Sequence, residues 1–512
     1  MMIPLAQLQA IPQGEDYIRI LPVLILSIFG IIVMVLDPLV DEEKSQKTLG
    51  LIAFIGTVAG LLSTWYMSHS PGLAFSGTVR VDSFSSFFSF LVIAIAAVVI
   101  LSSFEYMAVQ KIRAGEYYAL ILFGTVGMLL MSSAIELVLI FIGLEISSIS
   151  TYILAGFRRN EASSSESSLK YFLLGSFATA FFLYGVALIF GATGSTNIEA
   201  IGQKLQTTPA EMLVYVAMAL MFVGLGFKVA AAPFHVWTPD VYEGAPAPVV
   251  GFMSTAPKAA AFAVLLRVVF SINAPGRYWF LWVAAALSMT LGNVGALVQG
   301  NVKRLLAYSS IAHAGYLLVA FAMTTPENSL SGISAAMFYT AAYAAMNVGA
   351  FAVVSHFANA GERYVTLEDY EGLGRSSPLL AATLTIFLLS LIGIPMTGGF
   401  FAKFYVFSAA LRANLVWLTI IGVLNSAIGA YYYLRIIVMM YMRESRKEVP
   451  VAPISPGLGV ALAISIVATL YLGLLPNRLL QITQHSAQSV LPGSTSSPGM
   501  AQNLHQSNSA NE

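Results

Sequence analysis

Long apolar runs separated by short polar segments make up almost the whole chain. A helix that spans a bilayer needs about 20 apolar residues, and the pattern predicts fourteen such helices. Their approximate ranges are 17–37, 48–67, 84–107, 116–132, 134–157, 167–191, 211–230 (continuing to about 243), 246–271, 277–299, 302–322, 330–357, 379–409, 412–442 and 456–476. We therefore predict an all-α polytopic membrane protein.

Two of the predicted spans contain helix-breaking residues. The seventh has Pro233 and Pro239, and the twelfth has Gly393, Pro395, Gly398 and Gly399. Proline removes a backbone donor and glycine weakens a helix. Breaks persist in a membrane only where protein or water satisfies the freed backbone groups. Paired broken helices in the two halves of a transporter are the best sequence indication of its transport site.

The breaks lie five spans apart, so repeats of five helices would be inverted relative to each other in the membrane. This spacing suggests three N-terminal helices in 1–115 and a first repeat, helices 4–8, in 116–271. A second repeat, helices 9–13, would occupy 272–442 and a last transmembrane helix 443–483. Residues 484–512 are rich in Ser, Gln, Asn and Pro, and we expect a disordered polar tail.

Composition excludes several functional classes. The 512 residues are 57% hydrophobic and only 10% charged, whereas soluble domains are about 25% charged. The absence of cysteine excludes disulfides, thiolate metal sites and iron–sulfur ligation. The zero net charge gives no basic face for nucleic acid. We expect no metal and no cofactor on this chain.

Lys and Arg are unevenly distributed between the two sets of loops. The loops with Lys47, Arg158, Arg159 and Arg375 belong to the richer set. Cytoplasmic loops carry the excess of positive residues, so this set should be cytoplasmic. With an even number of spans, both termini are then expected on the outer, periplasmic side of a bacterial cytoplasmic membrane.

Four charged residues lie inside apolar spans, namely Glu145, Lys228, Lys258 and Lys403. A charge near the bilayer centre costs at least about 2.5–3.5 kcal/mol, and such groups commonly mark ion or proton pathways. The alternative interpretations are a protonated Glu145 bonded to a neighbouring helix and a Lys228 whose ammonium reaches the interface. We expect Glu145 and Lys228 to lie within ion-pair reach or one water apart, because a pair avoids burying either charge alone.

Further polar residues are candidates for a proton relay. His235 lies beside the first break, and His313 and Tyr308 lie in the tenth span. Histidine titrates near neutral pH, although a lone intramembrane histidine is about as often a packing residue. The cluster Tyr431–Tyr433 reads as an interfacial aromatic belt.

Five segments carry a family resemblance: FIGLEISSISTYILAGF, LKYFLLGSFATAFFLYG, GFKVAAAPFHVWTPDVYEGAPAPV, KRLLAYSSIAHAGY and SLIGIPMTGGFFAKF. With them the chain resembles the antiporter-like membrane subunits of NADH-quinone oxidoreductase, respiratory complex I. The family's four proton-carrying positions match Glu145, Lys228, Lys258 and Lys403. The resemblance implies a glutamate at the position of Lys403 in M-type subunits and a histidine at the position of Lys258 in L-type subunits, so these two lysines argue against both types.

The resemblance implies a proton-translocating subunit of an enzyme complex. NAD, FMN, iron–sulfur clusters and quinone would bind partner subunits, and the chain itself would contact other membrane subunits and lipid. The alternatives are a subunit of a sodium/proton antiporter and subunit 2 of a photosynthetic-type NAD(P)H-quinone oxidoreductase. A third is a structural subunit whose polar residues only join helices.

Overall fold

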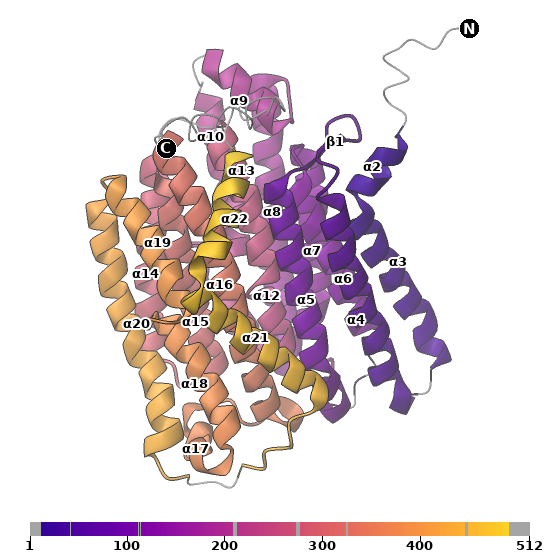
Figure 1. Cartoon of the computed structure of the whole chain (residues 1–512), viewed down its shortest axis with the longest axis vertical. Coiled ribbons are helices and arrows are strands. Elements are labelled where there is room, and N and C mark those ends of the chain that lie inside the picture. Colours follow the sequence, from indigo (N-terminus) through magenta and orange to yellow (C-terminus); the bar gives the residue numbers. More distant parts are fainter. Residues whose placement is uncertain are drawn as a thin grey trace, which may run out of the picture.

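The computed structural model describes residues 12–40, 42–110, 112, 114–207, 212–272, 277–323, 326–445 and 449–490. Nearly all of them form helices that run side by side along one axis (Figure 1). Thirteen of the described helical segments are long and apolar enough to cross a membrane. A fourteenth crossing consists of two shorter helices, which lie where the sequence predicts a broken twelfth span. The predicted all-α polytopic fold is confirmed.

The N-terminal part lies along one side of the bundle (Figure 1). Its elements are α2 (Gly14–Arg19), α3 (Leu21–Leu36), η1 (Asp37–Leu39), α4 (Glu42–Met67), β1 (Gly72–Ala74), β2 (Val79–Val81) and α5 (Ser83–Gln110). The two strands form a short antiparallel hairpin in which Leu73 pairs with Arg80.

The middle of the chain supplies two groups of helices. The first comprises α6 (Gly115–Ser133), α7 (Leu137–Ala155), α8 (Ala162–Thr193), α9 (Ile198–Thr207), α10 (Met212–Val229), α11 (Trp237–Gly244), α12 (Ala247–Met253) and α13 (Ala256–Ile272). The second comprises α14 (Arg277–Leu297), α15 (Val302–Val319), η2 (Ala320–Ala322), α16 (Pro326–Ala358), η3 (Ala360–Glu362), η4 (Leu367–Tyr370), α17 (Leu373–Ser376), α18 (Pro378–Ile392), α19 (Gly398–Arg412) and α20 (Val416–Met442).

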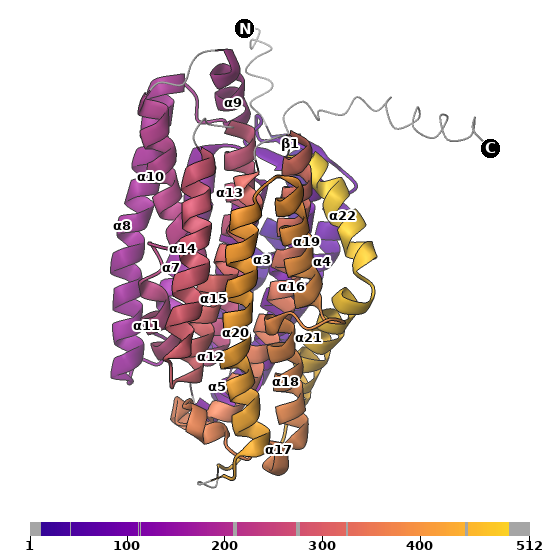
Figure 2. The same ribbon diagram turned by 90° about the vertical axis from the view of Figure 1, so that its left-hand side faces the viewer.

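Helices α21 (Pro456–Leu474) and α22 (Pro476–Gln488) complete the described chain. They cross obliquely over α5 and α16 (Figures 1 and 2). The expected disorder from residue 484 is therefore wrong up to Gln488, because α22 continues through these residues and buries Thr483, Ser486 and Ala487. The rest of the expected tail, residues 491–512, lies outside the described residues.

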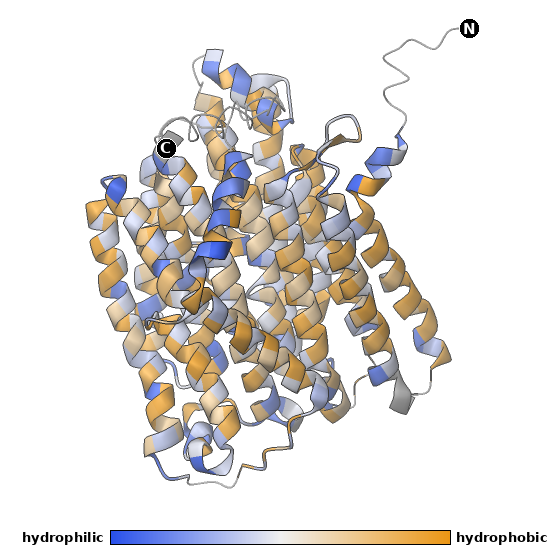
Figure 3. Cartoon of the chain, viewed as in Figure 1, coloured by the Kyte–Doolittle hydropathy of each residue, from blue (hydrophilic) through white to orange (hydrophobic). Residues whose placement is uncertain are grey.

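Polar residues gather at the two ends of the bundle and along α22, whereas the middle of the helices is mostly apolar (Figure 3). Many large apolar side chains on the outside are exposed, including Ile31 on α3, Phe177 on α8 and Leu424 on α20. This pattern suits a surrounding of lipid rather than water. Helix α2 and the end of α22 lie at the same end of the bundle (Figure 1), as an even number of crossings requires.

The first break lies between α10 and α11. Helix α10 ends at Val229, Ala230 has φ +60°, and α11 begins only at Trp237. Pro233 lies inside this irregular segment, as predicted. Pro239 does not break a helix, because it occupies the first turn of α11, where the missing proline N–H has no helical acceptor to lose.

The second break lies between α18 and α19. Helix α18 ends at Ile392, Gly393 follows with φ +93°, and α19 begins at Gly398. Pro395 lies in the connection. Gly399 is also required by packing, because a Cβ there would fall 1.8 Å from the carbonyl oxygen of Ser390.

A third interruption was not predicted. The eighth span divides at Ser254 and Thr255 into α12 and α13. Both hydroxyls donate back to the carbonyl of Gly251, and Pro257 supplies no N–H of its own. The discontinuity lies three residues before Lys258.

Candidate functional site

Lys228 lies in the last turn of α10, immediately before the first break. It is only 3% exposed, and its ammonium donates to the hydroxyl of Ser148 on α7 at 2.9 Å. The ring of Tyr171 lies 5.9 Å from the same nitrogen. The alternative interpretation, in which the ammonium of Lys228 reaches the membrane interface, does not fit this geometry, because the ammonium points into the bundle.

Glu145 lies on α7 one turn before Ser148. Its Oε1 atom is buried and has no hydrogen-bond partner in the described part of the chain, although the residue as a whole is partly exposed. Lys228 bonds Ser148 rather than this carboxylate, so no direct ion pair joins the two expected partners. Because the carboxylate still acts electrostatically on Lys228, the water-bridged form of the expectation stays a prediction.

Lys258 lies in the first turn of α13, three residues after the interruption of the eighth span. Its ammonium donates to the hydroxyl of Ser310 on α15 at 2.6 Å and to the Ser310 carbonyl at 3.1 Å. Tyr343 on α16 donates to the same hydroxyl at 2.8 Å. Nearby, Asn347 binds Ser254 at 2.7 Å and so ties α16 to the interruption itself.

His313 lies on the same face of α15, one turn beyond Ser310. Its Nδ1 lies 2.7 Å from the hydroxyl of Tyr339, and its Nε2 lies 3.3 Å from the hydroxyl of Tyr433. Tyr433 in turn bonds Ser309. The charges of Lys258 and Lys403 both act on His313, so the imidazole lies near both ammonium groups.

Lys403 lies in α19, but its side chain turns back across the second break. The ammonium donates to the carbonyls of Leu391 and Ile392 at 3.1 and 2.8 Å and to the Ser426 hydroxyl at 2.8 Å. It also lies 5.1 Å from the centre of the Tyr316 ring. The carbonyl end of a helix attracts a cation, so the end of α18 forms the binding site for this charge.

The aromatic residues that neighbour Lys403 in the sequence do not surround its ammonium. Phe400, Phe401 and Phe404 pack against one another, and Phe404 is half exposed. Lys403 is buried instead by groups from α15, α18 and α20. Sequence neighbours on a helix point in different directions, which explains the difference.

The other relay candidates lie apart from these contacts. His235 is partly exposed in the first break. The ring of Tyr308 lies against Gly295 of α14. Of the expected aromatic belt, Tyr432 and Tyr433 are buried and only Tyr431 is exposed. The interfacial interpretation is therefore wrong for Tyr433, which bonds His313 and Ser309.

A buried ion cluster lies near one end of the bundle, away from the lysine series. Glu362 accepts from Lys303 at 2.6 Å, from Tyr106 at 2.8 Å and from the backbone N–H of Ala247 at 2.7 Å. Arg158 approaches the same carboxylate at 3.4 Å. Burial raises the pKa of Glu362, but the two cations outweigh it and hold the pKa below the ordinary value. The carboxylate is therefore ionised at neutral pH.

Lys303 also donates to the carbonyls of Glu243 and Ala245, at 2.8 and 2.6 Å. The cluster thus joins the end of α11, the start of α12 and the end of α16. Arg158 lies in the connection between α7 and α8, and Lys303 lies in the first turn of α15, yet both are buried. Arg158 also lines a cleft of about 450 Å³ with Glu116, Arg159 and Glu161.

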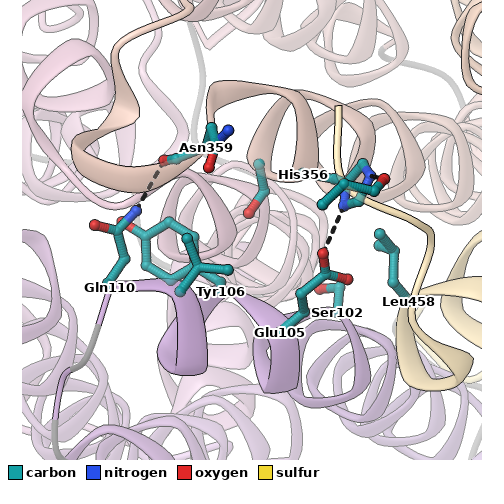
Figure 4. Close-up of a pocket in the computed structure, with 10 residues that line it drawn as sticks. Ser102, Glu105, Tyr106, Gln110, His356, Asn359 and Leu458 are labelled. Carbon is teal, nitrogen blue, oxygen red and sulfur yellow. Dashed lines mark hydrogen bonds and ion pairs between the residues drawn. The ribbon is translucent and has the colours of Figure 1, made fainter. Parts of the chain in front are cut away.

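A second polar contact between α5 and α16 lies close to this cluster (Figure 4). Glu105 pairs with Nδ1 of His356 at 3.0 Å, while Nε2 of His356 lies 3.0 Å from the carbonyl of Ala452. Gln110 donates to the carbonyl of Asn359 at 3.0 Å. In the described residues, no group of three or more His, Asp or Glu side chains is arranged to hold a metal ion.

A series of intramembrane lysines beside broken helices is the arrangement to compare with known proteins. The model of the transmembrane NADH:quinone oxidoreductase and Mrp antiporter family matches residues 134–429. The chain belongs to this family. The matched region contains all four predicted charged residues, together with Ser310, His313 and Tyr343.

Several family members are similar over most of the chain. NADH-quinone oxidoreductase subunit N 2 of Koribacter versatilis is 66% identical over 93% of this chain and 98% of its own. Subunit N 1 of Solibacter usitatus is 49% identical over 92% of this chain and 97% of its own. Among solved structures, a chain of respiratory complex I from Thermus thermophilus is 37% identical, with a TM-score of 0.77 over 90% of this chain and 98% of that chain.

Proposed function

We propose that the chain is the N-type antiporter-like subunit of a proton-translocating NADH:quinone oxidoreductase. Its relatives at 66% and 49% identity bear that subunit's name. The main support for proton translocation is the group formed by Lys258, Ser310 and His313. This group connects the two broken-helix regions. The competing antiporter assignment shares the family, but these two relatives favour the oxidoreductase.

The proposed pathway runs from Glu145 through Lys228 and Lys258 to Lys403. Each lysine is buried, and burial disfavours the charged form of an amine. Each also has a hydroxyl acceptor, namely Ser148, Ser310 or Ser426. An ammonium can thus pass its proton on and be recharged from the next group, with water bridging separated groups.

Redox chemistry takes place elsewhere in the proposed complex. NAD, FMN, iron–sulfur clusters and quinone belong to partner subunits, since the sequence has no cysteine and no glycine-rich dinucleotide motif. Glu145 is partly exposed on an otherwise apolar surface of α7 that includes Ile142 and Ile149. A neighbouring membrane subunit would cover this surface and shield the carboxylate from lipid. The complex would lie in a bacterial cytoplasmic membrane with both ends of this chain outside.

The proposed division follows the two breaks. Residues 116–271 and 272–442 would act as inverted repeats, and Lys258 would transfer protons between them. Its place supports this role, because it belongs to α13 of the first repeat and binds Ser310 on α15 of the second.

Replacing Lys258 by Met tests the proposal. Methionine keeps the length and apolar stem of lysine but carries no proton, so NADH-driven proton pumping should fall several-fold while the complex still assembles. Pumping per NADH in inverted vesicles and assembly on native gels are the measurements. Undiminished sodium-independent pumping by the assembled variant would disprove the linking role; sodium-dependent transport without NADH oxidation would favour the antiporter.

A further inference from the structure

A groove of about 830 Å³ lies between α5, α16, α21 and α22. These helices meet on the face of the bundle shown in Figure 1, where α21 and α22 cross in front of α5 and α16. The groove is separate from the lysine series. It does, however, include Ala344 and Ala345, the two residues that follow Tyr343, and Tyr343 bonds Ser310 from the other side of α16.

The lining of the groove changes character along the membrane normal. Ser83 and Ser86 lie in the first turn of α5, and Gln481, His485 and Ser486 lie on α22 near its end. Deeper along α5 the lining is Phe90, Leu91, Ala94 and Val98. With a rise of 1.5 Å per residue, Ser83 and Val98 differ in depth by about 22 Å. Apart from Ser465 and Tyr471 on α21, the deep part is apolar.

The outer end of the groove is lined by polar residues of two helices. Ser83 lies in the first turn of α5, Gln481 and His485 lie on α22, and the two helices are in contact. Ser86 also lines this end, but its hydroxyl is inaccessible and makes no hydrogen bond in the described structure. The polar side chains available to an occupant are therefore those of Ser83, Gln481 and His485.

We propose that this groove binds one glycerophospholipid, with its acyl chains along α5 and α16 and its headgroup between Ser83, Gln481 and His485. An apolar cavity of this size is not stably filled by water, which needs several polar partners. A wholly apolar occupant would leave the polar end unsatisfied. The hydroxyl, amide and imidazole groups suit the phosphate and ester oxygens of a lipid, whose length along the membrane normal matches the change in lining.

The bound lipid also closes the outer wall of the lysine series. Tyr343 is separated from the groove only by the width of α16, because its neighbours Ala344 and Ala345 line the groove and have small side chains. Acyl chains in the groove would therefore pack against the side of α16 that lies opposite the bond between Tyr343 and Ser310.

A matched pair of substitutions on α21 tests the proposal. Ala468 lines the groove, whereas Ala463 on the same helix is exposed and does not. The assembled complex is reconstituted with phosphatidylethanolamine that carries a diazirine in its acyl chain. It is then extracted into dodecyl maltoside, washed and irradiated, so that only retained lipid labels the protein. Labelled residues are mapped by mass spectrometry.

Residues 90–98 and 341–348 should be labelled in the unaltered complex and in Ala463→Phe, and labelling should be lost in Ala468→Phe, which fills the groove. If Ala468→Phe fails to assemble, Ala345→Phe replaces it with the same expectation. Equal labelling in the filled and control variants overturns the proposal. So does absence of labelling in the unaltered complex, or labelling by a photoreactive quinone in place of the lipid.

Discussion

Lys303 and Lys403 make nearly the same bonds but differ in one partner. Each donates to two backbone carbonyls at the end of a helix, Lys303 beside the end of α11 and Lys403 at the end of α18. The third acceptor of Lys303 is the carboxylate of Glu362, whereas that of Lys403 is the hydroxyl of Ser426.

The difference indicates two distinct uses for a buried ammonium. Beside a carboxylate, a lysine is held in its charged form, and loss of its proton would leave a buried anion without that partner. Beside carbonyls and a hydroxyl, the charged form is bound by dipoles, and the neutral amine leaves no opposite charge uncompensated. We infer that Lys303 is a fixed structural charge and that Lys403 exchanges its proton.

Replacing Lys303 by Met should have the largest effect on the folded chain. It removes one partner of a buried ion pair, a change that typically costs about 3–5 kcal/mol. We expect little assembled complex, as measured on native gels. Lys403→Met is the control and should assemble normally. If both variants assemble equally well, the distinction between the two lysines fails.

Replacing Lys403 by Arg should leave assembly intact and remove proton transfer. Arginine keeps the charge beside the α18 carbonyls but does not release its proton in proteins. Positioned proton carriers contribute about 10²–10⁴-fold, so pumping through this subunit should fall at least about tenfold. Proton uptake by vesicles during NADH oxidation is the measurement, and full pumping by an assembled variant would refute proton exchange at Lys403.

Gly393→Ala should have a smaller and more local effect. The left-handed conformation costs a non-glycine residue about 1–2 kcal/mol, and an added Cβ would also lie 3.2 Å from Cδ of Lys403. Gly194 is the matched control, since it has φ +73° and no neighbouring atom within 4 Å of an added Cβ. Both alanine variants should lower the melting temperature, but only Gly393→Ala should also reduce pumping.

The smallest effect concerns acid stability through Glu362. Its folded-state pKa lies below the unfolded value of about 4.3. The stabilisation is therefore complete above that pH and is lost as the pH falls through the folded pKa. Between about pH 5 and 8 this contribution is constant, so Glu362 should add no pH dependence to thermal unfolding there. Below about pH 4 the unaltered protein should lose stability more steeply than Glu362→Gln, and parallel curves would count against the ion cluster.

The sequence was sufficient for the helices and the four charges, because long apolar runs and charges inside them have few alternative explanations. It was not sufficient for their partners. Ser148, Ser310 and Tyr433 are ordinary residues in transmembrane helices, and only tertiary packing selects them from many similar ones. Lys303 lies at the start of an apolar run, so the sequence alone suggests an ordinary charged residue at a loop.

The helix breaks show the same limit. Pro239 and Pro257 both lie in the first turn of a helix that begins directly after an interruption, α11 and α13 respectively. A proline in the first turn of a helix is harmless, so its effect depends on where the preceding residues leave the helical conformation. For the interruption at Ser254, Pro257 was the available signal.

Helix α15 holds several groups of the lysine series on one rigid element. Lys303 fastens one end to the ion cluster, and farther along it Ser310, His313 and Tyr316 lie at spacings of three residues on one side. A helix turns 100° per residue, so rotation by a single residue would swing all three groups away from their partners together. The contacts to Lys258, Tyr433 and Lys403 therefore all depend on one orientation of a single helix.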